Sequence, residues 1–432
     1  MSPIEIGILG CVALFLLLLS SMPVAFVMLL VGTVGFAVVV SPQAALTMVC
    51  SDVFNTISSH SLTVIPLFVF MGQVAFHAGI SKRLFNAAYN WLGWLPGGLA
   101  MATVGACAGF GAICGSGPAT AATMSAVALP EMKRYRYNME LATGTVAAGG
   151  TLGMLIPPSV VFIVYGVMTE QSIGKLFMAG VVPGLLIAVL FCVMIWWQCR
   201  RRPSLGPAAQ GITWSARWRS LSGVIETLLL FALVIGGMFA GWFTPTEAAA
   251  VGAAGSLLIA VVRRQLSRQA LVRALMETAR TSCMVMIIVA GAVIFGRFLA
   301  VTRIHFELAT WLTALAAPPW MVVALIVLFY LVCGCFIDAL GLVMLTIPIF
   351  YPVIQSLNYD LIWFGVIIVV VTQMGVISPP VGVNVYVVSG MERDVALHTV
   401  FKGALPFLAC LILAAALLVA FPQLSLWLPS LM

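Results

Sequence analysis

Residues 115–118, Gly-Ser-Gly-Pro, interrupt a hydrophobic run that begins near residue 98 and ends near Pro130. Each arm of this run is too short to cross a bilayer, which takes roughly 20 helical residues. We therefore expect a re-entrant hairpin over about 98–130 with residues 115–118 at its tip. Non-helical backbone at membrane depth persists only where protein buries it or where it lines a wet cavity. The tip is where a transported solute or ion is expected to bind.

Three further breaks occur in apolar runs. They lie at Pro157-Pro158 in a predicted broken helix at about 141–169, at residues 338–341 in a predicted second hairpin at about 319–352, and at Pro379-Pro380 in a predicted broken helix at about 361–389. Discontinuous helices of this kind surround the binding sites of secondary transporters near the middle of the bilayer.

The breaks place the ends of half-helices inside the membrane. Pro118 suits the first turn of a helix, and Ser116 or Gly117 can cap it. Unpaired N–H groups and the positive end of the helix dipole favour an anion, whereas free carbonyls with Ser and Thr hydroxyls suit Na⁺. We expect substrate and ion ligands among Gly115, Ser116, Gly117, Pro118, Thr120, Thr151, Pro157, Pro158, Ser159, Asp338, Gly341, Ser378, Pro379, Pro380 and Asn384.

For Na⁺ itself, the expected ligands are Ser116, Asp338 and backbone carbonyls near Gly153 and Gly375. An Asp inside the membrane costs roughly 2.5–3.5 kcal/mol on insertion scales, so a purely structural role is not expected. It should pair with Na⁺, with a cationic side chain or with free N–H groups. For each single Ser or Thr the alternative is a packing role, because small and hydroxyl residues are common between membrane helices.

The composition indicates a polytopic helical membrane protein, with 62% hydrophobic and 8% charged residues. The net charge of +7 does not indicate a nucleic-acid partner, because the basic residues lie in short loops beside apolar spans. The 10 Cys are scattered through apolar segments without a Cys-x-x-Cys pair or a His cluster, which favours core packing over disulfides or a metal site. Glu5 and the lack of an early Lys or Arg predict an uncleaved first span rather than a signal peptide.

The two halves of the chain repeat at a nearly fixed offset. Pro23 and Pro245 differ by 222 positions, and the same offset relates Pro130 to Pro352, Gly153 to Gly375, Pro157-Pro158 to Pro379-Pro380, and Glu170 to Glu392. Several matches in one order indicate an internal repeat. We expect a first repeat over 1–200, a cytoplasmic linker over 201–221 and a second repeat over 222–432. Each contains five spans and one hairpin, so the second copy is inverted.

The predicted spans follow the apolar runs. They lie near 3–20, 22–40, 62–79, 141–169, 176–199, 222–243, 246–262, 282–301, 361–389 and 404–421. A polar stretch with Asp52, Asn55 and His60 separates the second span from the third, and a basic arm at 263–280 precedes the eighth. Amphipathic patterns at 80–97 and 303–316 predict two helices in the membrane interface.

Loop charge predicts the sidedness of this topology. With residues 200–220 in the cytoplasm, all basic residues except Lys175, Arg297 and Arg303 fall on the cytoplasmic side, which is 17 of the 20. Both termini are then expected in the periplasm. The remaining membrane charges, Glu226, Glu247 and Arg297, should pair with one another or face water.

Four segments carry a resemblance to a known family. GAICGSGPATAATM at 111–124, GTLGMLIPPS at 150–159, TPTEAAAVGA at 244–253 and GVISPPVGVN at 375–384 resemble the large membrane subunit of tripartite ATP-independent periplasmic (TRAP) transporters, the DctM-like family. The resemblance extends over essentially the whole chain. Pro118 departs from the small residues that often follow the Gly-Ser of this motif.

The resemblance implies an elevator-type importer of organic anions such as dicarboxylates or sialic acid, with Na⁺ as coupling ion and no other cofactor. It implies two protein partners, a small four-span membrane subunit and a soluble periplasmic substrate-binding protein. It also implies a place in the bacterial inner membrane. Because the chain begins directly with the large-subunit pattern, we expect the small subunit to be a separate chain.

Two alternatives remain open from the sequence. A stand-alone Na⁺/dicarboxylate carrier of related fold would share the repeat and the hairpins but would not depend on a binding protein. An intramembrane enzyme would need two apposed acids or a His-Glu-x-x-His site; Asp338 has no evident partner acid and no such motif occurs. Gly174-Lys175 is followed by Leu176, so this is not a nucleotide-binding loop. We therefore expect a transporter and not an enzyme.

Overall fold

The structure is a computed structural model. It describes residues 2–20, 22–208, 213–304, 307 and 318–432. Within these ranges the ordered elements are helices joined by short loops, and no strand occurs. Six of the described helices are long and apolar enough to span a membrane by length and composition: His60–His77, Ile173–Arg201, Pro245–Val262, Arg268–Thr302, Ala339–Ser356 and Leu397–Ala420. The all-α, polytopic fold class predicted from the sequence is confirmed.

The first five helices are α1 (Pro3–Leu19), α2 (Val24–Val39), α3 (Pro42–Ile57), α4 (Val64–His77) and α5 (Ile80–Leu92). The stretch predicted only as polar is the helix α3, which Ser41 caps through its side chain and Pro42 starts. Its polar residues, Asp52 and Asn55 among them, are why the segment lacks the hydropathy of a span. The segment predicted at 80–97 as a helix in the membrane interface forms the helix α5, which ends earlier than expected, before Gly93. Its counterpart at 303–316 falls mostly outside the described residues.

The first hairpin consists of α6 (Gly98–Cys114) and α7 (Gly117–Arg134). The first broken helix consists of α8 (Met139–Thr151), a 3-10 turn over Leu152–Met154 and α9 (Val160–Thr169). The long α10 (Ile173–Arg201) closes the first half. The interruptions at residues 115–118 and at Pro157-Pro158 lie where the sequence predicts them, whereas α7 continues through Pro130, the predicted end of the hairpin, to Arg134.

The second half opens with α11 (Trp214–Leu221), α12 (Ile225–Phe231), a π-helical turn over Ala232–Gly236, α13 (Gly237–Phe239), α14 (Pro245–Val262) and α15 (Arg268–Thr302). The expected basic arm at 263–280 is not a separate arm beyond Ser267. It forms the first turns of α15, a single helix of 35 residues. The exposed Arg side chains at this end lower the hydropathy without interrupting the helix.

The chain ends with α17 (Pro319–Gly334), α18 (Ala339–Ser356), α19 (Leu361–Gly375), α20 (Val383–Met391), α21 (Leu397–Ala420) and α22 (Gln423–Leu426). The helices α17 and α18 form the second hairpin, and α19 and α20 form the second broken helix. The peptide bonds Pro157-Pro158 and Pro379-Pro380 are both cis.

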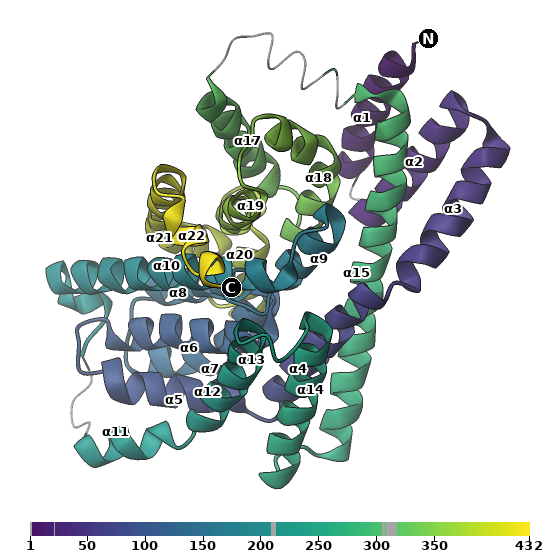
Figure 1. The fold of residues 1–432 in the computed structure, drawn as a ribbon. Coiled ribbons are helices and arrows are strands. Elements are labelled where there is room, and N and C mark those ends of the chain that lie inside the picture. Colours follow the sequence, from purple (N-terminus) through teal and green to yellow (C-terminus); the bar gives the residue numbers. More distant parts are fainter. Residues whose placement is uncertain (1, 21, 209–212, 305–306, 308–317) are drawn as a thin grey trace.

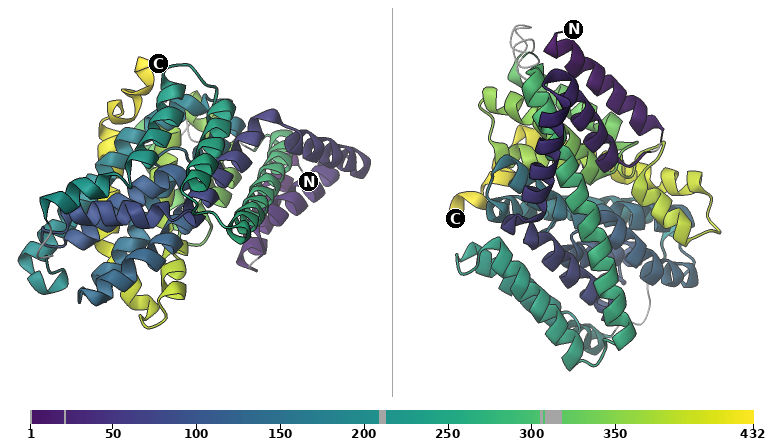
Figure 2. Two further views of the ribbon diagram at one scale, coloured as in Figure 1. Left: turned by 90° about the horizontal axis from the view of Figure 1, so that it is seen from below. Right: turned by 90° about the vertical axis from the view of Figure 1, so that its right-hand side faces the viewer.

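The helices form two bodies. In Figure 1, α1, α2, α3 and α15 form one layer along the right-hand side, and both views of Figure 2 show the same grouping. The helix α15 packs against α1, α2, α3 and α4, and α4 packs against α14. In the second body α8 packs against α6, α7, α20 and α21. The helix α19 packs against α17, α18 and α21, so both hairpins and both broken helices belong to this body. We call these the α15 layer and the hairpin body.

The loops predicted to be cytoplasmic gather at one face. Lys133 Nζ lies 2.6 Å from Glu392 and 3.1 Å from Asp394, and these hydrogen bonds raise the pKa of Lys133 above its ordinary value. The buried Tyr137 donates to the Pro207 carbonyl at 3.0 Å. These contacts join the ends of α7 and α8 to the linker after α10 and to the loop before α21. At the opposite end, Met432 lies beside Gly174, which is the expected periplasmic side.

Of the two arrangements expected for Glu226, Glu247 and Arg297, pairing with one another does not occur. Glu226 pairs with Arg263, and Arg297 Nε lies 3.3 Å from Asp52. Glu247 and Thr244 form a reciprocal capping box at the start of α14. The sequence pattern could not identify these partners. Arg263 lies just after α14, Asp52 belongs to the unpredicted helix α3, and Thr244 is the N-cap residue of α14.

Candidate functional site

The tip of the first hairpin is a tight turn with an uncapped hydroxyl. Gly115 ends α6 with a φ of +66°, where a side chain would be strained. Ser116 stands at the N-cap position of α7, but its side chain makes no capping hydrogen bond. The carbonyl of Ser116 accepts from Thr120 Oγ1 at 2.7 Å and from the Thr120 N–H at 3.1 Å. The Ser116 hydroxyl is therefore free to bind a ligand.

The tip lies directly against the break of the first broken helix. A Cβ on Gly153 would lie 2.6 Å from Thr120 Oγ1 and 2.9 Å from the Ser116 carbonyl oxygen. A Cβ on Gly115 would lie 2.6 Å from the Pro158 carbonyl oxygen. These approaches leave room only for glycine, and they bring hydroxyl and carbonyl oxygens of two elements together.

The tip of the second hairpin is capped by a carboxylate. Asp338 is the N-cap residue of α18, and its Oδ2 accepts from the N–H of Leu340 at 3.1 Å and of Gly341 at 3.4 Å. Of the three partners expected for this charge, the structure supplies the free N–H groups. Gly341 faces α2, where a Cβ would meet the side chain of Val24.

The second break repeats the contact between tip and broken helix. A Cβ on Gly375 would lie 2.6 Å from the Gly334 carbonyl oxygen at the end of α17. The Ser378 hydroxyl donates to the Met374 carbonyl, and Asn384 Nδ2 donates to the Ala147 carbonyl at 3.1 Å. Asn384 thus joins the start of α20 to α8 of the other repeat.

A cavity of about 300 Å³ lies between the two tips. Both tips line it, together with the start of α9, and α4 and α15 line the opposite wall. The lining residues are Val69, Gln73, Cys114, Gly115, Ser116, Gly117, Pro118, Ala119, Met154, Val160, Val161, Thr281, Met284, Val285, Asp338, Ala339 and Leu340. The first turns of α7, α9 and α18 therefore meet at one space, which brings the positive ends of three helix dipoles together with the Asp338 carboxylate.

Only some of the predicted site residues line this cavity. The Gly-Ser-Gly-Pro tip and Asp338 do. Ser159 is buried behind it and caps α9 by accepting from the Phe162 N–H. The remaining hydroxyl and amide candidates are buried in helix contacts and hydrogen-bond to backbone carbonyls: Thr120, Thr151, Ser378 and Asn384. Pro157, Pro158, Pro379 and Pro380 form the non-helical segments themselves.

The sequence matches a known protein family over almost its whole length. Residues 11–424 match the family model described as "Tripartite ATP-independent periplasmic transporter, DctM component". The chain belongs to this TRAP transporter family. The resemblance of its hairpin and Pro-Pro motifs is thereby confirmed.

Named relatives are large permease proteins of the same family. The C4-dicarboxylate TRAP transporter large permease protein DctM of Pseudomonas aeruginosa is 36% identical over 378 residues, which is 87% of this chain and 88% of the relative. The sialic acid TRAP transporter large permease protein SiaM of Vibrio cholerae is 34% identical over 417 residues, 96% of each chain. This TRAP permease is a multi-pass inner membrane transporter subunit and not an enzyme. Proteins of this family work with a small membrane subunit and a periplasmic binding protein.

The fold also resembles solved transporter structures. The Alcanivorax borkumensis YdaH transporter matches with a TM-score of 0.64 over 88% of each chain, at 15% sequence identity. At this identity the likeness concerns the fold alone, which the TRAP permease therefore shares with a transporter outside its own close relatives.

The structure adds three polar residues to the candidate site. Gln73 of α4 and Thr281 of α15 line the cavity from the wall opposite the tips. Gln373 of α19 is fully buried, and within the described part of the chain neither of its amide atoms has a hydrogen-bond partner. Gln73 and Gln373 could have been noticed as amides inside apolar runs. Thr281 could not, because nothing in the sequence places α15 opposite the tips.

Proposed function

We propose that the chain imports an organic anion with a carboxylate group by Na⁺ symport, through an elevator motion of the hairpin body against the α15 layer. It receives the anion from a soluble periplasmic binding protein and works with a small four-span membrane subunit. The observation that carries the proposal is the cavity between the two hairpin tips. The tips of both hairpins line one side of it, and the helices α4 and α15 line the other.

The helix ends around the cavity support an anionic substrate. Ser159 caps α9 and Asp338 caps α18, whereas Ser116 leaves α7 without a side-chain cap. The N-terminus of α7 is thus open to an external acceptor, and an anion is the preferred ligand of such an end. The names of the two relatives above contain C4-dicarboxylate and sialic acid, and both compounds carry carboxylate groups. We assign the substrate carboxylate to the first turn of α7.

The oxygen atoms behind the tips support Na⁺ as the coupling ion. The Ser116 carbonyl and Thr120 Oγ1 lie against Gly153. Na⁺ is a hard cation that prefers such oxygen ligands. We propose sites that include Ser116 with carbonyls near Gly153 in the first repeat, and Asp338 with carbonyls near Gly375 in the second. No cluster of three or more His, Cys, Asp or Glu occurs in the described ranges.

The division into two bodies supports an elevator motion. The cavity lies at their boundary, with both tips on one side and α4 and α15 on the other. A second space of about 590 Å³, lined by Asp52, Glu170 and Arg297, lies between α3 and α15 on one side and the ends of α9 and α18 on the other. We propose that this second space is the periplasmic entrance, with both termini on the same side.

The deciding experiment is uptake into proteoliposomes. The chain is reconstituted with its small membrane subunit, and a panel of carboxylates and one sulfonate is offered with and without the binding protein, in a Na⁺ or a K⁺ gradient. We expect uptake of a carboxylate that requires both Na⁺ and the binding protein. Uptake without the binding protein would favour the stand-alone carrier instead. Equal uptake in K⁺ would refute Na⁺ coupling.

A further inference from the structure

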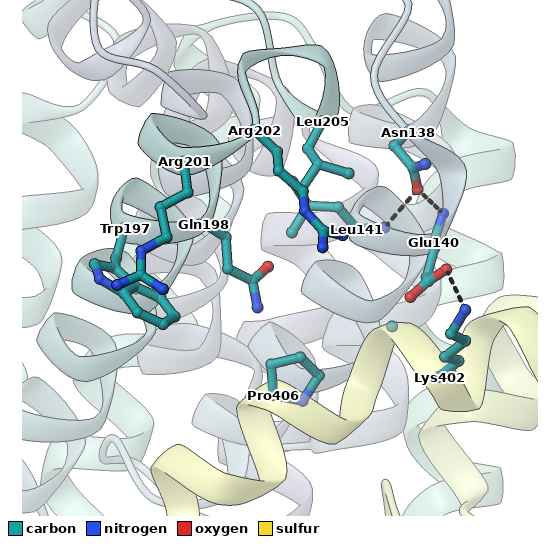
Figure 3. Close-up of a pocket in the computed structure, with 11 residues that line it drawn as sticks. Asn138, Glu140, Leu141, Trp197, Gln198, Arg201, Arg202, Leu205, Lys402 and Pro406 are labelled. Atoms are coloured by element: carbon teal, nitrogen blue, oxygen red, sulfur yellow. Dashed lines mark hydrogen bonds and ion pairs between the residues drawn. The ribbon is translucent and has the colours of Figure 1, made fainter.

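A third, basic pocket lies at the ends of α8, α10 and α21, away from the cavity between the hairpin tips. It has a volume of about 480 Å³ and is lined by the ends of α8, α10 and α21 and by the loop after α10. None of its residues lines the cavity between the tips. Figure 3 shows Gln198, Arg201 and Arg202 on one side of the pocket and Lys402 on the other.

The pocket carries an excess of positive charge. Its charged residues are Arg201, Arg202, Lys402 and Glu140. Glu140 lies 3.5 Å from Lys402 and offsets one of the three cations. Among the residues that the structure describes, no carboxylate lies within ion-pair distance of Arg201 or Arg202. Two guanidinium groups thus remain available for an anion, and their planar forks suit phosphate oxygens.

The backbone around the pocket is fixed by hydrogen bonds. Asn138 caps α8 by accepting from the N–H of Glu140 at 2.8 Å and of Leu141 at 3.3 Å. The Asn138 N–H donates to the Leu205 carbonyl at 3.0 Å, which holds the loop after Arg202 against α8. The Arg201 guanidinium lies 4.0 Å from the centre of the Trp197 ring. The pocket is therefore formed before any ligand arrives.

An exposed apolar stripe leads along α10 to the pocket. Leu185, Val189, Val193 and Trp197 repeat every four residues, and each is between 49% and 58% exposed. Residues at this spacing share one face of a helix. Trp197 belongs both to the stripe and to the pocket lining, so the apolar face ends at the basic residues. Trp beside Arg at the end of an apolar span marks the membrane interface.

We propose that the pocket binds the phosphate headgroup of an anionic phospholipid whose acyl chains lie along the α10 stripe. Arg201, Arg202 and Lys402 hold the phosphate, and Gln198 donates to its oxygens or to the glycerol. Basic pockets between membrane helices on the cytoplasmic side bind such headgroups. Free phosphate would use the cations alone, whereas the stripe adds a surface that only a lipid needs. The bound lipid would join α8 and α10 of the first repeat to α21 of the second.

The test compares lipid retention by variants of the full chain. The wild-type protein, the triple variant Arg201→Gln/Arg202→Gln/Lys402→Gln and the control Arg219→Gln/Arg268→Gln/Arg273→Gln are placed in nanodiscs of equal parts phosphatidylglycerol and phosphatidylethanolamine. The control removes three exposed basic residues outside the pocket. Native mass spectrometry then counts the lipids that stay bound after release. We expect wild type and control to retain phosphatidylglycerol, and the pocket variant to retain it at least tenfold less.

Three further arms make the result decisive. Val189→Ser, within the stripe, should also weaken phosphatidylglycerol retention, and the single variant Arg202→Gln should weaken it if the triple variant fails to fold. Inorganic phosphate at millimolar concentration should not displace the lipid. Equal retention by wild type and the pocket variant, equal loss in the control, or displacement by inorganic phosphate would each overturn the proposal.

Discussion

Ser116 and Asp338 stand 222 positions apart, at equivalent places in the two repeats, and line the same cavity. Each is the N-cap residue of the second arm of its hairpin. The Ser116 side chain leaves α7 uncapped, whereas the Asp338 carboxylate accepts two N–H groups of α18. The uncapped N-terminus of α7 and the hydrogen-bonded Asp338 carboxylate therefore line one cavity. This arrangement suits an anion at the helix N-terminus beside a cation at the carboxylate.

Asp338→Asn separates the charge of this residue from its role as a cap. Asn caps helices about as well as Asp, so the variant should fold and insert normally. Because the carboxylate is gone, we expect half-maximal uptake to need several times more Na⁺, or uptake to be lost. Asp338→Ala, which also removes the cap, should in addition lower the stability by about 1 kcal/mol. Unchanged Na⁺ dependence in the Asn variant would leave Asp338 as a cap alone.

Ser116→Ala tests the uncapped hydroxyl at the first tip. Since this hydroxyl makes no capping hydrogen bond, its removal should not destabilise α7. We expect the Na⁺ concentration for half-maximal uptake to rise about threefold to tenfold while the protein still reaches the membrane. Ser125→Ala is the matched control, because Ser125 lies on the same helix and donates to the Ala121 carbonyl. Equal Na⁺ curves for both variants would contradict the assignment of Ser116.

Gly153→Ala should displace the first tip from the broken helix. The added methyl would lie 2.6 Å from Thr120 Oγ1 and 2.9 Å from the Ser116 carbonyl oxygen, so one element has to move. We expect uptake to fall at least tenfold with near-normal expression. Gly236→Ala serves as the control, because nothing lies within 4 Å of its added Cβ. Wild-type uptake by Gly153→Ala would show that this contact does not shape the site.

Much of this fold could be predicted because glycine, proline and charge mark it in the sequence. The hairpin tips, both Pro-Pro breaks and the 222-residue offset are all visible as interruptions of apolar runs. The helix α3 was missed because its polar residues face Arg297 and a cavity rather than lipid. The continuity of α15 was missed because its first turns carry exposed Arg residues, which lower the hydropathy of that part of the helix.

The candidate site was predictable only in part, for a physical reason. Sequence patterns locate the places where helices break, and these include both tips. They do not tell which hydroxyls face a cavity and which donate to a carbonyl within their own helix, as Thr120 and Thr151 do. Nor do they indicate which helix forms the opposite wall, since Gln73 and Thr281 reach the cavity only through tertiary packing.

Arg201 and Lys175 should lie on opposite sides of the membrane. Lys175 is near the start of α10 and Arg201 at its end, and both are exposed. In a Cys-free background, Arg201→Cys should react with a membrane-impermeant thiol reagent only after the cells are opened. Lys175→Cys should react in intact cells with a permeable outer membrane. Labelling of both from one side would contradict the proposed sidedness.

Cross-links across and within the two bodies test the elevator motion. Gly296 of α15 and Pro348 of α18 face each other, and a Cβ on Gly296 would lie 3.6 Å from that of Pro348, a separation that a disulfide spans. With other Cys removed, oxidised Gly296→Cys/Pro348→Cys should lose uptake and regain it on reduction, because the disulfide fixes the hairpin body to the α15 layer. The control joins Gly149→Cys to the native Cys107 within the hairpin body, where the Cβ atoms would lie 3.3 Å apart. Its oxidation should spare uptake, and equal loss in both pairs would count against rigid-body motion.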